Sequence, residues 1–391
     1  MRITVMGAAG VQAQGVIRDL CSSPEVMEVI LADLEKLKDV LAFRAKEWGE
    51  GKAKVQFTDA TNPESLRAAV RGSKVTANCI GHDFNLRVMD ACIAEGSHYL
   101  DMGGLFHVAR KQMLRDAEWK AKGLTGILGM GSAPGIVSVM AGYCAARLDT
   151  IEYIYLRDGI ANYAKSDFPI TIPYAAQTLL QEFTDPAYVF ENGDWKEVQP
   201  FTLGEVIDFP QPVGTMTVYP TIHSEVATVP VAFKSKGIKH MNFKLGLPAD
   251  FEQKMRFLSG IGFGSTKPLK VKDAEIAPRD YFVALAETFP KPAGKPADYK
   301  CLRVDAKGVK NGEEVEIRTE MMCSPYEPWN MKTGPFTVGG PVGITARMLG
   351  AGIITERGCV GPEIGVPPEK FFEYCAKRGL HTKVTITRPI A

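Results

Sequence analysis

The chain of 391 residues contains 45% hydrophobic and 23% charged residues, a composition typical of a globular protein with a full core, and its length favours two domains. Its 46 Lys and Arg residues nearly balance its 45 Asp and Glu residues, so it lacks the positive field that binding to nucleic acid or an anionic membrane requires. It does not open with a basic stretch followed by an apolar segment, and no apolar run reaches the roughly 18 residues of a membrane span. We therefore expect a cytoplasmic protein with a small-molecule partner, no nucleic acid and no membrane.

The first third of the chain alternates apolar runs with amphipathic runs, which is the pattern of a parallel sheet covered by helices. The predicted strands are residues 3–6, 29–32, 54–57, 75–79, 98–100 and 125–128. The predicted helices between them are residues 10–20, 34–47, 62–70, 85–95 and 108–122. This order predicts an α/β fold with a doubly wound parallel sheet.

After about residue 130 the strands alternate in polarity, at residues 152–157, 300–305 and 314–321, which indicates an antiparallel sheet with one packed face. Asn311 and Gly312 tolerate positive φ, so they predict a hairpin between the last two of these strands. The C-terminal part predicts helices over residues 342–351 and 368–378 and a strand over residues 383–387.

A glycine-containing turn joins the first predicted strand to the first helix. Residues 5–13 (VMGAAGVQA) have the form G-x-x-G-x-x-A, a shortened version of the Rossmann-type dinucleotide fingerprint. Gly7, Ala9, Gly10 and Val11 can bring the backbone and a helix N-terminus close to a pyrophosphate. The alternative is that the two glycines only make a tight turn.

An acidic residue at the end of the second strand identifies the cofactor. Asp33 can accept hydrogen bonds from the adenosine ribose hydroxyls and would repel the 2′-phosphate of NADP, so we expect NAD. The adenine and ribose-nicotinamide parts of the crevice are expected at the ends of strands three and four, at Asp59, Ala60, Ile80 and Gly81. Asp59 could instead be a helix cap or a turn residue. The eight Cys and six His residues show no metal-ligand spacing, so no metal is expected.

Several segments in order along the chain resemble the saccharopine dehydrogenase-like family. They are residues 91–101 (ACIAEGSHYLD), 129–135 (GMGSAPG), 182–183, 191–193, 223–225, 358–363 and 371–379. Within the family the bacterial L-lysine 6-dehydrogenases look closest, because the fungal type carries an Asp where this chain has Ala133. Some members carry an Arg in the segment where this chain has Gln177, so a dicarboxylic product such as saccharopine is in doubt.

The resemblance implies a domain organisation and an assembly. The C-terminal helices would return to the first domain, so residues 1–129 and 339–391 form the dinucleotide-binding domain. Residues 130–338 would then be an inserted α+β substrate-binding and dimerisation domain, and the protein would be a homodimer. The loop with Ser132, Ala133 and Pro134, together with Gln177, would line the substrate site.

Oxidation of an amine by NAD needs a base and a clamp for the substrate carboxylate. His223 and Glu225 are two positions apart in a loop or strand edge, where side chains at i and i+2 point to the same side, so we expect a base with its orienting carboxylate. The alternative is a buried structural histidine, with Glu225 paired to a lysine such as Lys244.

Asp101 and Arg157 complete the candidate set. Asp101 follows the fifth strand, at the carboxyl edge where doubly wound sheets bind ligands, although it could also cap the next turn. Arg157 could hold the α-carboxylate, or form a surface pair with Asp158.

The expected function is therefore an NAD-dependent dehydrogenase that oxidises the C–N bond of a basic amino acid, as a lysine 6-dehydrogenase does, to give the semialdehyde and ammonia. One alternative is a saccharopine- or carboxynorspermidine-type reductase that joins an amine to an aldehyde or keto acid. A non-catalytic NAD-binding scaffold is an alternative of another class.

Overall fold

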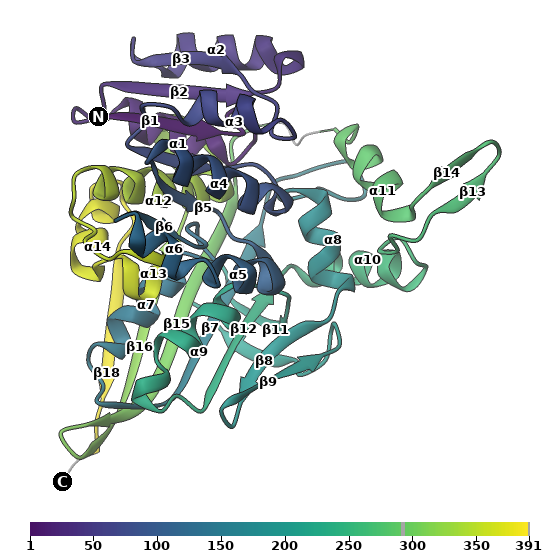
Figure 1. The fold of residues 1–391 in the computed structure, drawn as a ribbon. Helices are drawn as coiled ribbons and strands as arrows, with labels where there is room; N and C mark the ends of the chain where they lie inside the picture. Colours follow the sequence, from purple (N-terminus) through teal and green to yellow (C-terminus); the bar gives the residue numbers. More distant parts are fainter. Residues whose placement is uncertain (291–293, 390–391) are drawn as a thin grey trace.

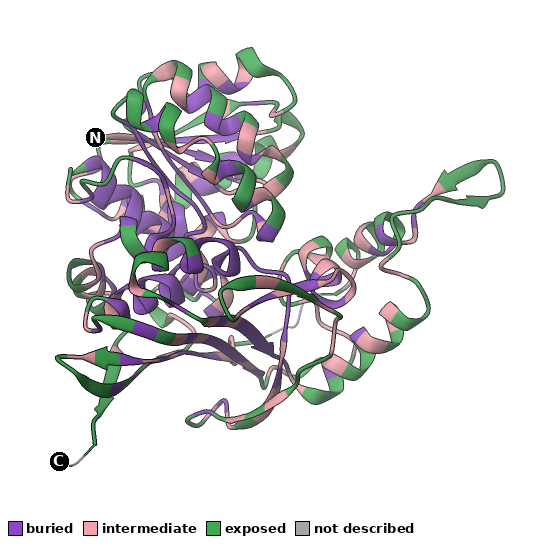
Figure 2. Cartoon of the chain, turned by 60° about the horizontal axis from the view of Figure 1, so that its bottom comes forward, coloured by how far each residue is buried: buried purple, intermediate pink, exposed green. Residues whose placement is uncertain are grey.

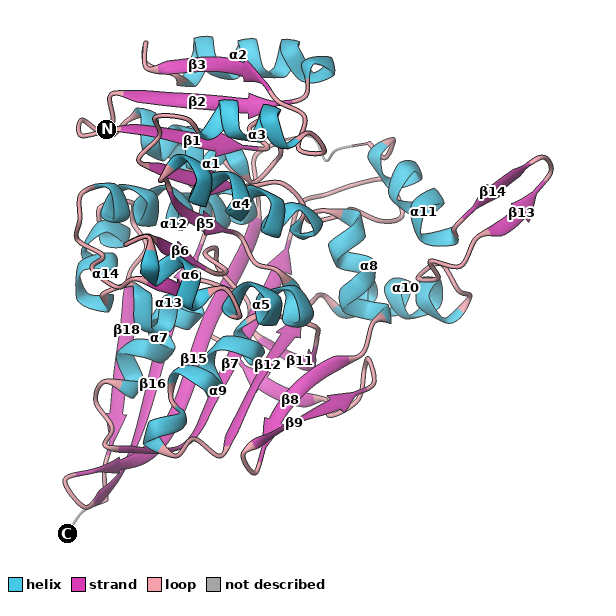
Figure 3. Ribbon diagram, viewed as in Figure 1, coloured by secondary structure: helices cyan, strands magenta, loops and turns pink. Residues whose placement is uncertain are grey.

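The computed structural model describes residues 1–290 and 294–389, which form two large sheets and a two-stranded hairpin, with helices around and between the large sheets (Figures 1 and 3). The first sheet is parallel throughout and has the strand order β17-β6-β5-β4-β1-β2-β3. Its strands are β1 (Arg2–Met6), β2 (Glu28–Asp33), β3 (Ala53–Phe57), β4 (Val75–Asn78), β5 (His98–Asp101), β6 (Thr125–Ile127) and β17 (Gly358–Val360). This order confirms the predicted doubly wound, Rossmann-type sheet.

Helices cover both faces of this sheet because successive strand residues point to opposite sides. Val5 packs with the residues of α1 (Ala13–Cys21) and α12 (Thr333–Gly350) in one core. Its neighbour Met6 packs in another core, with α3 (Pro63–Val70), α4 (Asn85–Glu95) and α6 (Asp116–Ala121). The remaining helices of this domain are α2 (Lys38–Trp48) and α5 (Leu105–Met113).

The second sheet is mixed and has the order β10-β11-β12-β7-β15-β16-β18, with β8 beside β12 and β9 beside β8. Strands β12 and β7 are parallel, and the other neighbours are antiparallel. The strands are β7 (Thr150–Asn162), β8 (Ala187–Glu191), β9 (Asp194–Val198), β10 (Glu205–Asp208), β11 (Thr215–Pro220), β12 (His240–Gly246), β15 (Asp298–Lys310), β16 (Glu313–Cys323) and β18 (Thr382–Thr387). The β15–β16 hairpin turns at Asn311 and Gly312, both at positive φ, as predicted.

Helices α7 (Ile136–Ala145) and α9 (Glu225–Ala232) pack on this second sheet. Helix α8 (Ala176–Thr184) packs with α10 (Ala249–Gly260) and α11 (Pro278–Glu287), and a small hairpin of β13 (Leu269–Val271) and β14 (Ala274–Ile276) connects α10 to α11 along the chain. The hairpin projects from the body and is exposed along most of its length (Figure 2). None of the described helices is both long and apolar enough to cross a membrane.

The C-terminal segment links the two sheets. After α12 it adds β17 to the first sheet and then forms α13 (Pro362–Gly365) and α14 (Pro368–Ala376). Buried Asp19 of α1 pairs with Arg347 of α12 at 2.9 Å and with Arg378 at 2.8 Å, which fastens this segment to the first domain. The final strand β18, however, pairs with β16 in the second sheet, so the expected assignment of all residues 339–391 to the first domain fails for this strand.

Candidate active site

A cleft of about 350 Å³ lies between the two domains, and we call it the central cleft. The first domain contributes Ile80 and Gly81, which follow β4, at the carboxyl edge where doubly wound sheets bind ligands. The loop before α7 contributes Ser132, Ala133 and Pro134. The second domain contributes titratable side chains that include Asp158, Tyr174, Glu182, His223 and Lys300. The cleft therefore brings expected cofactor and substrate residues together with His223.

His223 lies between two carboxylates. Its Nδ1 atom is 3.2 and 3.3 Å from the two oxygens of Glu225, and its Nε2 atom is 3.2 Å from Glu182 Oε1. The imidazole also stacks on Phe243 of β12, with ring centroids 3.9 Å apart. The expected pairing of His223 with Glu225 is therefore present, and Glu182 is a second partner that the sequence did not indicate.

These carboxylates set the charge of the imidazole. Burial by itself would lower the pKa of His223, but Glu225 and Glu182 outweigh burial and raise this pKa to about 10. Glu182 in turn accepts a hydrogen bond from the Tyr174 hydroxyl, whose pKa is raised well above its usual range by burial and by Glu182. The two carboxylates thus favour the protonated form of the imidazole at neutral pH.

A second charged pair forms another part of the cleft wall. Lys300 of β15 donates to Asp158 Oδ2 at 2.9 Å and to the Ser132 hydroxyl at 3.0 Å. The other oxygen of Asp158 is buried and has no hydrogen-bond partner among the described residues. Burial raises the pKa of Asp158, and Lys300 partly offsets this effect. Asp158 therefore has one free acceptor, suited to a substrate ammonium or hydroxyl.

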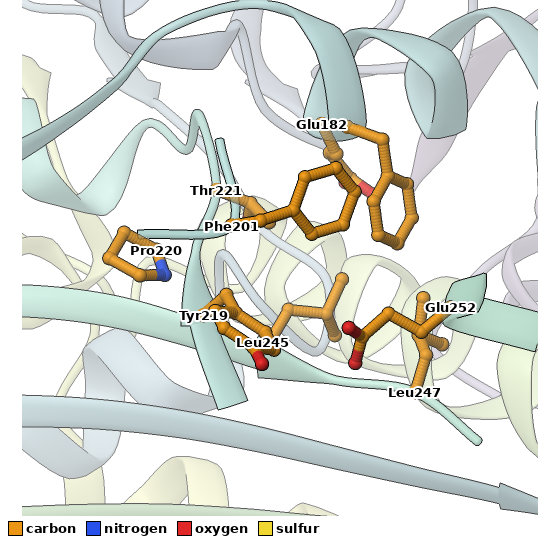
Figure 4. A pocket seen from close by; sticks show the side chains of 9 residues that line it. Glu182, Phe201, Tyr219, Pro220, Thr221, Leu245, Leu247 and Glu252 are labelled. Carbon is orange, nitrogen blue, oxygen red and sulfur yellow. The ribbon is translucent and has the colours of Figure 1, made fainter. Parts of the chain in front are cut away.

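A cavity of only about 10 Å³ lies beside Glu182 (Figure 4). Its lining is mostly apolar, with Phe201, Tyr219, Leu245 and Leu247. This space is about the size of one water molecule, so it does not hold a substrate. Its effect is to surround Glu182 with a medium of low dielectric constant, which strengthens the interaction of Glu182 with His223.

The turn between β1 and α1 fits a dinucleotide. Gly7 has φ of +72°, and a Cβ there would lie 2.8 Å from the backbone of Cys79, so only glycine fits this turn. Asp33 accepts hydrogen bonds from the backbone N–H groups of Ala9 and Leu34, both at 2.8 Å, at the end of β2. Gln12, at the start of α1, lines the cleft, and its buried carbonyl oxygen lacks a partner among the described residues. Gly7, Gly10, Asp33 and Gly81 would thus hold the dinucleotide along the carboxyl edge of the sheet.

Other expected cofactor residues lie further from the cleft. Val11 is exposed at the turn beside Gly10. Asp59 is exposed and accepts from the backbone N–H and hydroxyl of Thr61, which is the turn role given as the alternative. Ala60 lines a separate surface pocket between α3 and α4.

Asp101 does not have the geometry of a catalytic group. Its carboxylate is buried and accepts hydrogen bonds from five donors, at 2.6 to 3.1 Å: Tyr99, Gln112, Asn85 and the backbone N–H groups of Gly103 and Gly129. It is also outside the set of described residues that line the central cleft. Asp101 therefore acts structurally, by holding together the loops that follow β5 and β6.

Two expected substrate residues also lie outside the cleft. Arg157 donates to Glu205 at 2.7 Å and to Asn242 at 2.7 Å, and both contacts are on the far side of β7 from the cleft residue Asp158. The cause is strand alternation, since neighbours on a strand point to opposite faces. Gln177 is exposed on α8, whereas Thr178 and Glu182 of that helix line the cleft.

A doubly wound sheet with a glycine turn, facing a cleft of titratable groups, is the architecture of a nicotinamide dinucleotide-binding oxidoreductase. The comparisons with known proteins agree with this class. Residues 3–127 match the saccharopine dehydrogenase NADP binding domain, and residues 131–380 match the saccharopine dehydrogenase C-terminal domain. The chain belongs to the saccharopine dehydrogenase family.

Individual relatives match most of the chain. A carboxynorspermidine synthase from Vibrio alginolyticus is 26% identical over 78% of this chain and 76% of its own. A carboxyaminopropylagmatine dehydrogenase from Synechocystis is 22% identical over 99% of this chain and 98% of its own. The solved structure of saccharopine dehydrogenase (L-Glu forming) from Saccharomyces cerevisiae has the same fold, with a TM-score of 0.74, 17% identity and 99% of both chains covered.

Proposed function

We propose that the protein is a nicotinamide-dependent reductase that joins an amine to a carbonyl compound and reduces the resulting imine to a secondary amine. The observation that carries this proposal is the placement of His223 between Glu182 and Glu225 in the central cleft, where the two carboxylates favour its protonated form. The names of the relatives describe carboxylated polyamine-like compounds, which contain such a secondary amine.

Condensation of an amine with an aldehyde gives a carbinolamine, and loss of its hydroxyl as water needs a proton donor. The His223 imidazolium can give its Nε2 proton, which faces Glu182, to that hydroxyl while Glu225 holds the ring through Nδ1. The C–O bond then breaks, the nitrogen lone pair forms the C=N bond, and water leaves. The bound dinucleotide supplies the hydride that reduces the imine carbon.

The charges along the cleft match a substrate with both an amine and a carboxylate. The free oxygen of Asp158 and the carboxylate of Glu182 can hold an ammonium group. Lys300 is buried in the cleft wall, and Lys295 and Lys332 are exposed where they line it, so the three amines can hold a carboxylate. This arrangement replaces the Arg157 clamp expected from the sequence.

Oxidative deamination of lysine, the function first expected, uses the same bond in the opposite direction. It needs a neutral base at working pH, and the raised pKa of His223 makes the neutral imidazole a minor form. The named relatives also favour the reductive alternative. We therefore place lysine oxidation second.

The test is a cofactor-oxidation assay with NADH and with NADPH. Amino-acid semialdehydes and 2-keto acids are each paired with a series of diamines, and lysine with NAD or NADP is run in parallel. We expect oxidation only when amine and carbonyl are both present, with a secondary amine as the product by mass spectrometry. Turnover of lysine without turnover of any amine–carbonyl pair would make lysine oxidation the first candidate function. Turnover of neither would favour a non-catalytic dinucleotide-binding scaffold.

A further inference from the structure

A buried arginine behind the turn between β1 and α1 has no acidic partner. Arg44 of α2 is only 5% exposed, and it shares the buried side of this largely exposed helix with Leu41 alone. Its guanidinium hydrogen-bonds to backbone carbonyls, and it forms no ion pair with a carboxylate of the described residues. Burial lowers the pKa of Arg44 to about 10, although Asp33 opposes this effect from beyond ion-pair distance. A buried charge without a counter-ion is costly, so Arg44 calls for an anion that the chain does not supply.

The guanidinium of Arg44 is fixed against the glycine turn. Its Nη1 atom donates to the backbone carbonyl of Gly10 at 2.7 Å and also to that of Ala8. Trp48 of the same helix lies beside it, with the centre of its ring 5.3 Å from the guanidinium carbon, which is a cation–π contact. Arg44 therefore holds two carbonyl oxygens of the turn on the buried side.

These two contacts determine where the peptide N–H groups of the turn point. The peptide bonds that follow Ala8 and Gly10 are trans, so each C=O and the N–H of the next residue point in opposite directions. The Ala9 N–H therefore points away from Arg44, and Asp33 accepts it at 2.8 Å. The Val11 N–H also points away from Arg44, but it has no acceptor among the described residues. Because Gly10 and Val11 are exposed, the turn presents a free N–H donor to the outside.

A negative charge at the Val11 N–H group would be stabilised from two directions. Helix α1 begins two residues after Val11, and the partial positive charge of its N-terminus favours anions. The charge of Arg44 lies on the buried side of the same peptide units, where water and salt screen it little. In a doubly wound sheet this glycine turn receives the pyrophosphate of a dinucleotide, and the pyrophosphate carries the negative charge that Arg44 lacks.

We propose that Arg44 is a positioning residue for the cofactor, which turns the Val11 N–H towards the pyrophosphate and supplies the buried positive charge that the pyrophosphate neutralises. Arg44 acts through the peptide units whose carbonyl oxygens it holds, from the side of the turn opposite to the exposed N–H. This inference rests on the dinucleotide site alone, and it does not depend on the joining of an amine to a carbonyl compound.

Titrations with ADP-ribose, which contains the pyrophosphate, and with adenosine, which lacks it, test this role. We expect Arg44→Gln to weaken ADP-ribose binding at least about tenfold and adenosine binding by less than about twofold. Arg44→Lys keeps the charge and one hydrogen bond, so it should recover part of the loss. Lys46→Gln, at an exposed position of the same helix, is the matched control and should bind both ligands as the wild type does. Equal losses for the two ligands, or a loss that Arg44→Lys does not reduce, would overturn the proposal.

A measurement on the wild type needs no variant to fold. The amide signal of Val11, followed by NMR, should shift strongly when ADP-ribose binds and much less when adenosine binds, because only ADP-ribose brings an acceptor to this N–H. The same response to both ligands, or no response to ADP-ribose, would refute the orientation of Val11 on which the role of Arg44 depends. If these binding results are obtained but no amine–carbonyl pair is turned over, the proposed function fails and the role of Arg44 stands.

Discussion

The charge of His223 sets which proton-transfer role this side chain can take at neutral pH. An imidazole flanked by one carboxylate has a moderately raised pKa, but two carboxylates in a buried site keep it protonated well above neutral pH. The His223 side chain can therefore act as a proton donor when the reaction begins.

Replacing His223 with Gln removes this acid while keeping a polar side chain of similar reach. We expect kcat/KM for the amine–carbonyl pair to fall by roughly 10²–10⁴-fold, the usual contribution of general acid catalysis, with dinucleotide affinity unchanged. Steady-state kinetics and calorimetric titration with the cofactor would measure the two effects. His381→Gln, at an exposed position, is the control and should match the wild type. Full activity of His223→Gln would move the acid role to Tyr174 or Lys300.

The same histidine predicts how stability depends on pH. The folded protein binds the His223 proton more tightly, with a pKa of about 10, than the unfolded chain, where a histidine pKa is about 6.5. Its stabilising contribution is therefore complete below about pH 6.5 and is lost as pH rises towards 10.

Urea unfolding of the wild type and His223→Gln at several pH values would test this dependence. We expect the wild type to lose its advantage in free energy of unfolding, on the order of a few kcal/mol, between pH 6.5 and 10. Cysteine thiols of the unfolded chain titrate in the same range, but they are common to both proteins and cancel in the difference. A difference that grows with pH would mean that His223 is neutral in the folded protein.

A separate prediction concerns Asp33 and the preference for NAD over NADP. Its carboxylate lies at the end of β2 and is fixed by the N–H groups of Ala9 and Leu34. We expect NAD to bind more tightly than NADP, and Asp33→Ala combined with Leu34→Arg to shift the ratio of the two Kd values towards NADP by at least about tenfold. The ratio is the readout, because loss of the Ala9 contact weakens both cofactors. Equal wild-type affinities would contradict the role of Asp33.

Which residues of the site could be found from sequence depended on how local their geometry is. His223 and Glu225 are only two positions apart, so their spacing in the sequence is enough to predict that they are in contact. Which face of β7 lines the cleft is set by the whole sheet, so the sequence pattern favours Arg157, although its neighbour Asp158 is the residue that faces the cleft. Glu182 and Lys300 come from elements 41 residues before His223 and 168 residues after Ser132, separations over which sequence patterns carry no distance information.

At the scale of elements, α1 and α12 pack closely against each other. A Cβ at Gly15 would lie 2.4 Å from the carbonyl oxygen of Pro335 and 3.0 Å from the Cα of Gly339. These are backbone atoms, so the two helices can approach only because both carry glycine where they cross.

Gly15→Ala should therefore destabilise the protein by about 1–3 kcal/mol, since overpacking against backbone outweighs the gain in helix propensity. Gly340→Ala is the matched control in α12, because its Cβ would meet only the Phe336 ring at an ordinary 3.9 Å. It should be neutral or slightly stabilising. Thermal unfolding of both variants measures the difference in stability. Equal midpoints would mean that α1 and α12 can move apart to accept the methyl group without loss of stability.

The elements of the first sheet could be predicted because each strand and helix there has its own periodic pattern. The predicted helix over residues 108–122 is in fact α5 and α6, separated at Leu114 and Arg115. The elements between residues 163 and 297 are harder to predict from sequence. Short strands such as β8 and β10, and the helices α8 to α11, show only weak hydrophobic periodicity. Helix α12 begins at Thr333, nine residues before the predicted start. Its glycines and Pro341 have low helix propensity, so the sequence does not predict the first part of this helix, which is stabilised by burial.

At the scale of the whole molecule, the two domains share one core. A continuous cluster of buried side chains includes Val5 of the first sheet, Val139 of α7 and Val304 of the second sheet. The chain also crosses between the sheets repeatedly, and β18 returns to the second sheet after β17 has joined the first. This topology ties the first domain to the second more firmly than a hinge would.

We therefore expect both domains to unfold in one transition. Trp119 lies in the core between the first sheet and its helices, and Trp195 lies on β9 of the second sheet. Two variants, each retaining one of these tryptophans and carrying Phe at the other three Trp positions, would report the domains separately by fluorescence. Their thermal midpoints should coincide without cofactor and should rise together with it, because a ligand of the first domain stabilises every region that unfolds with that domain. A cofactor-dependent rise seen by Trp119 alone would mean that the domains unfold independently despite their shared core.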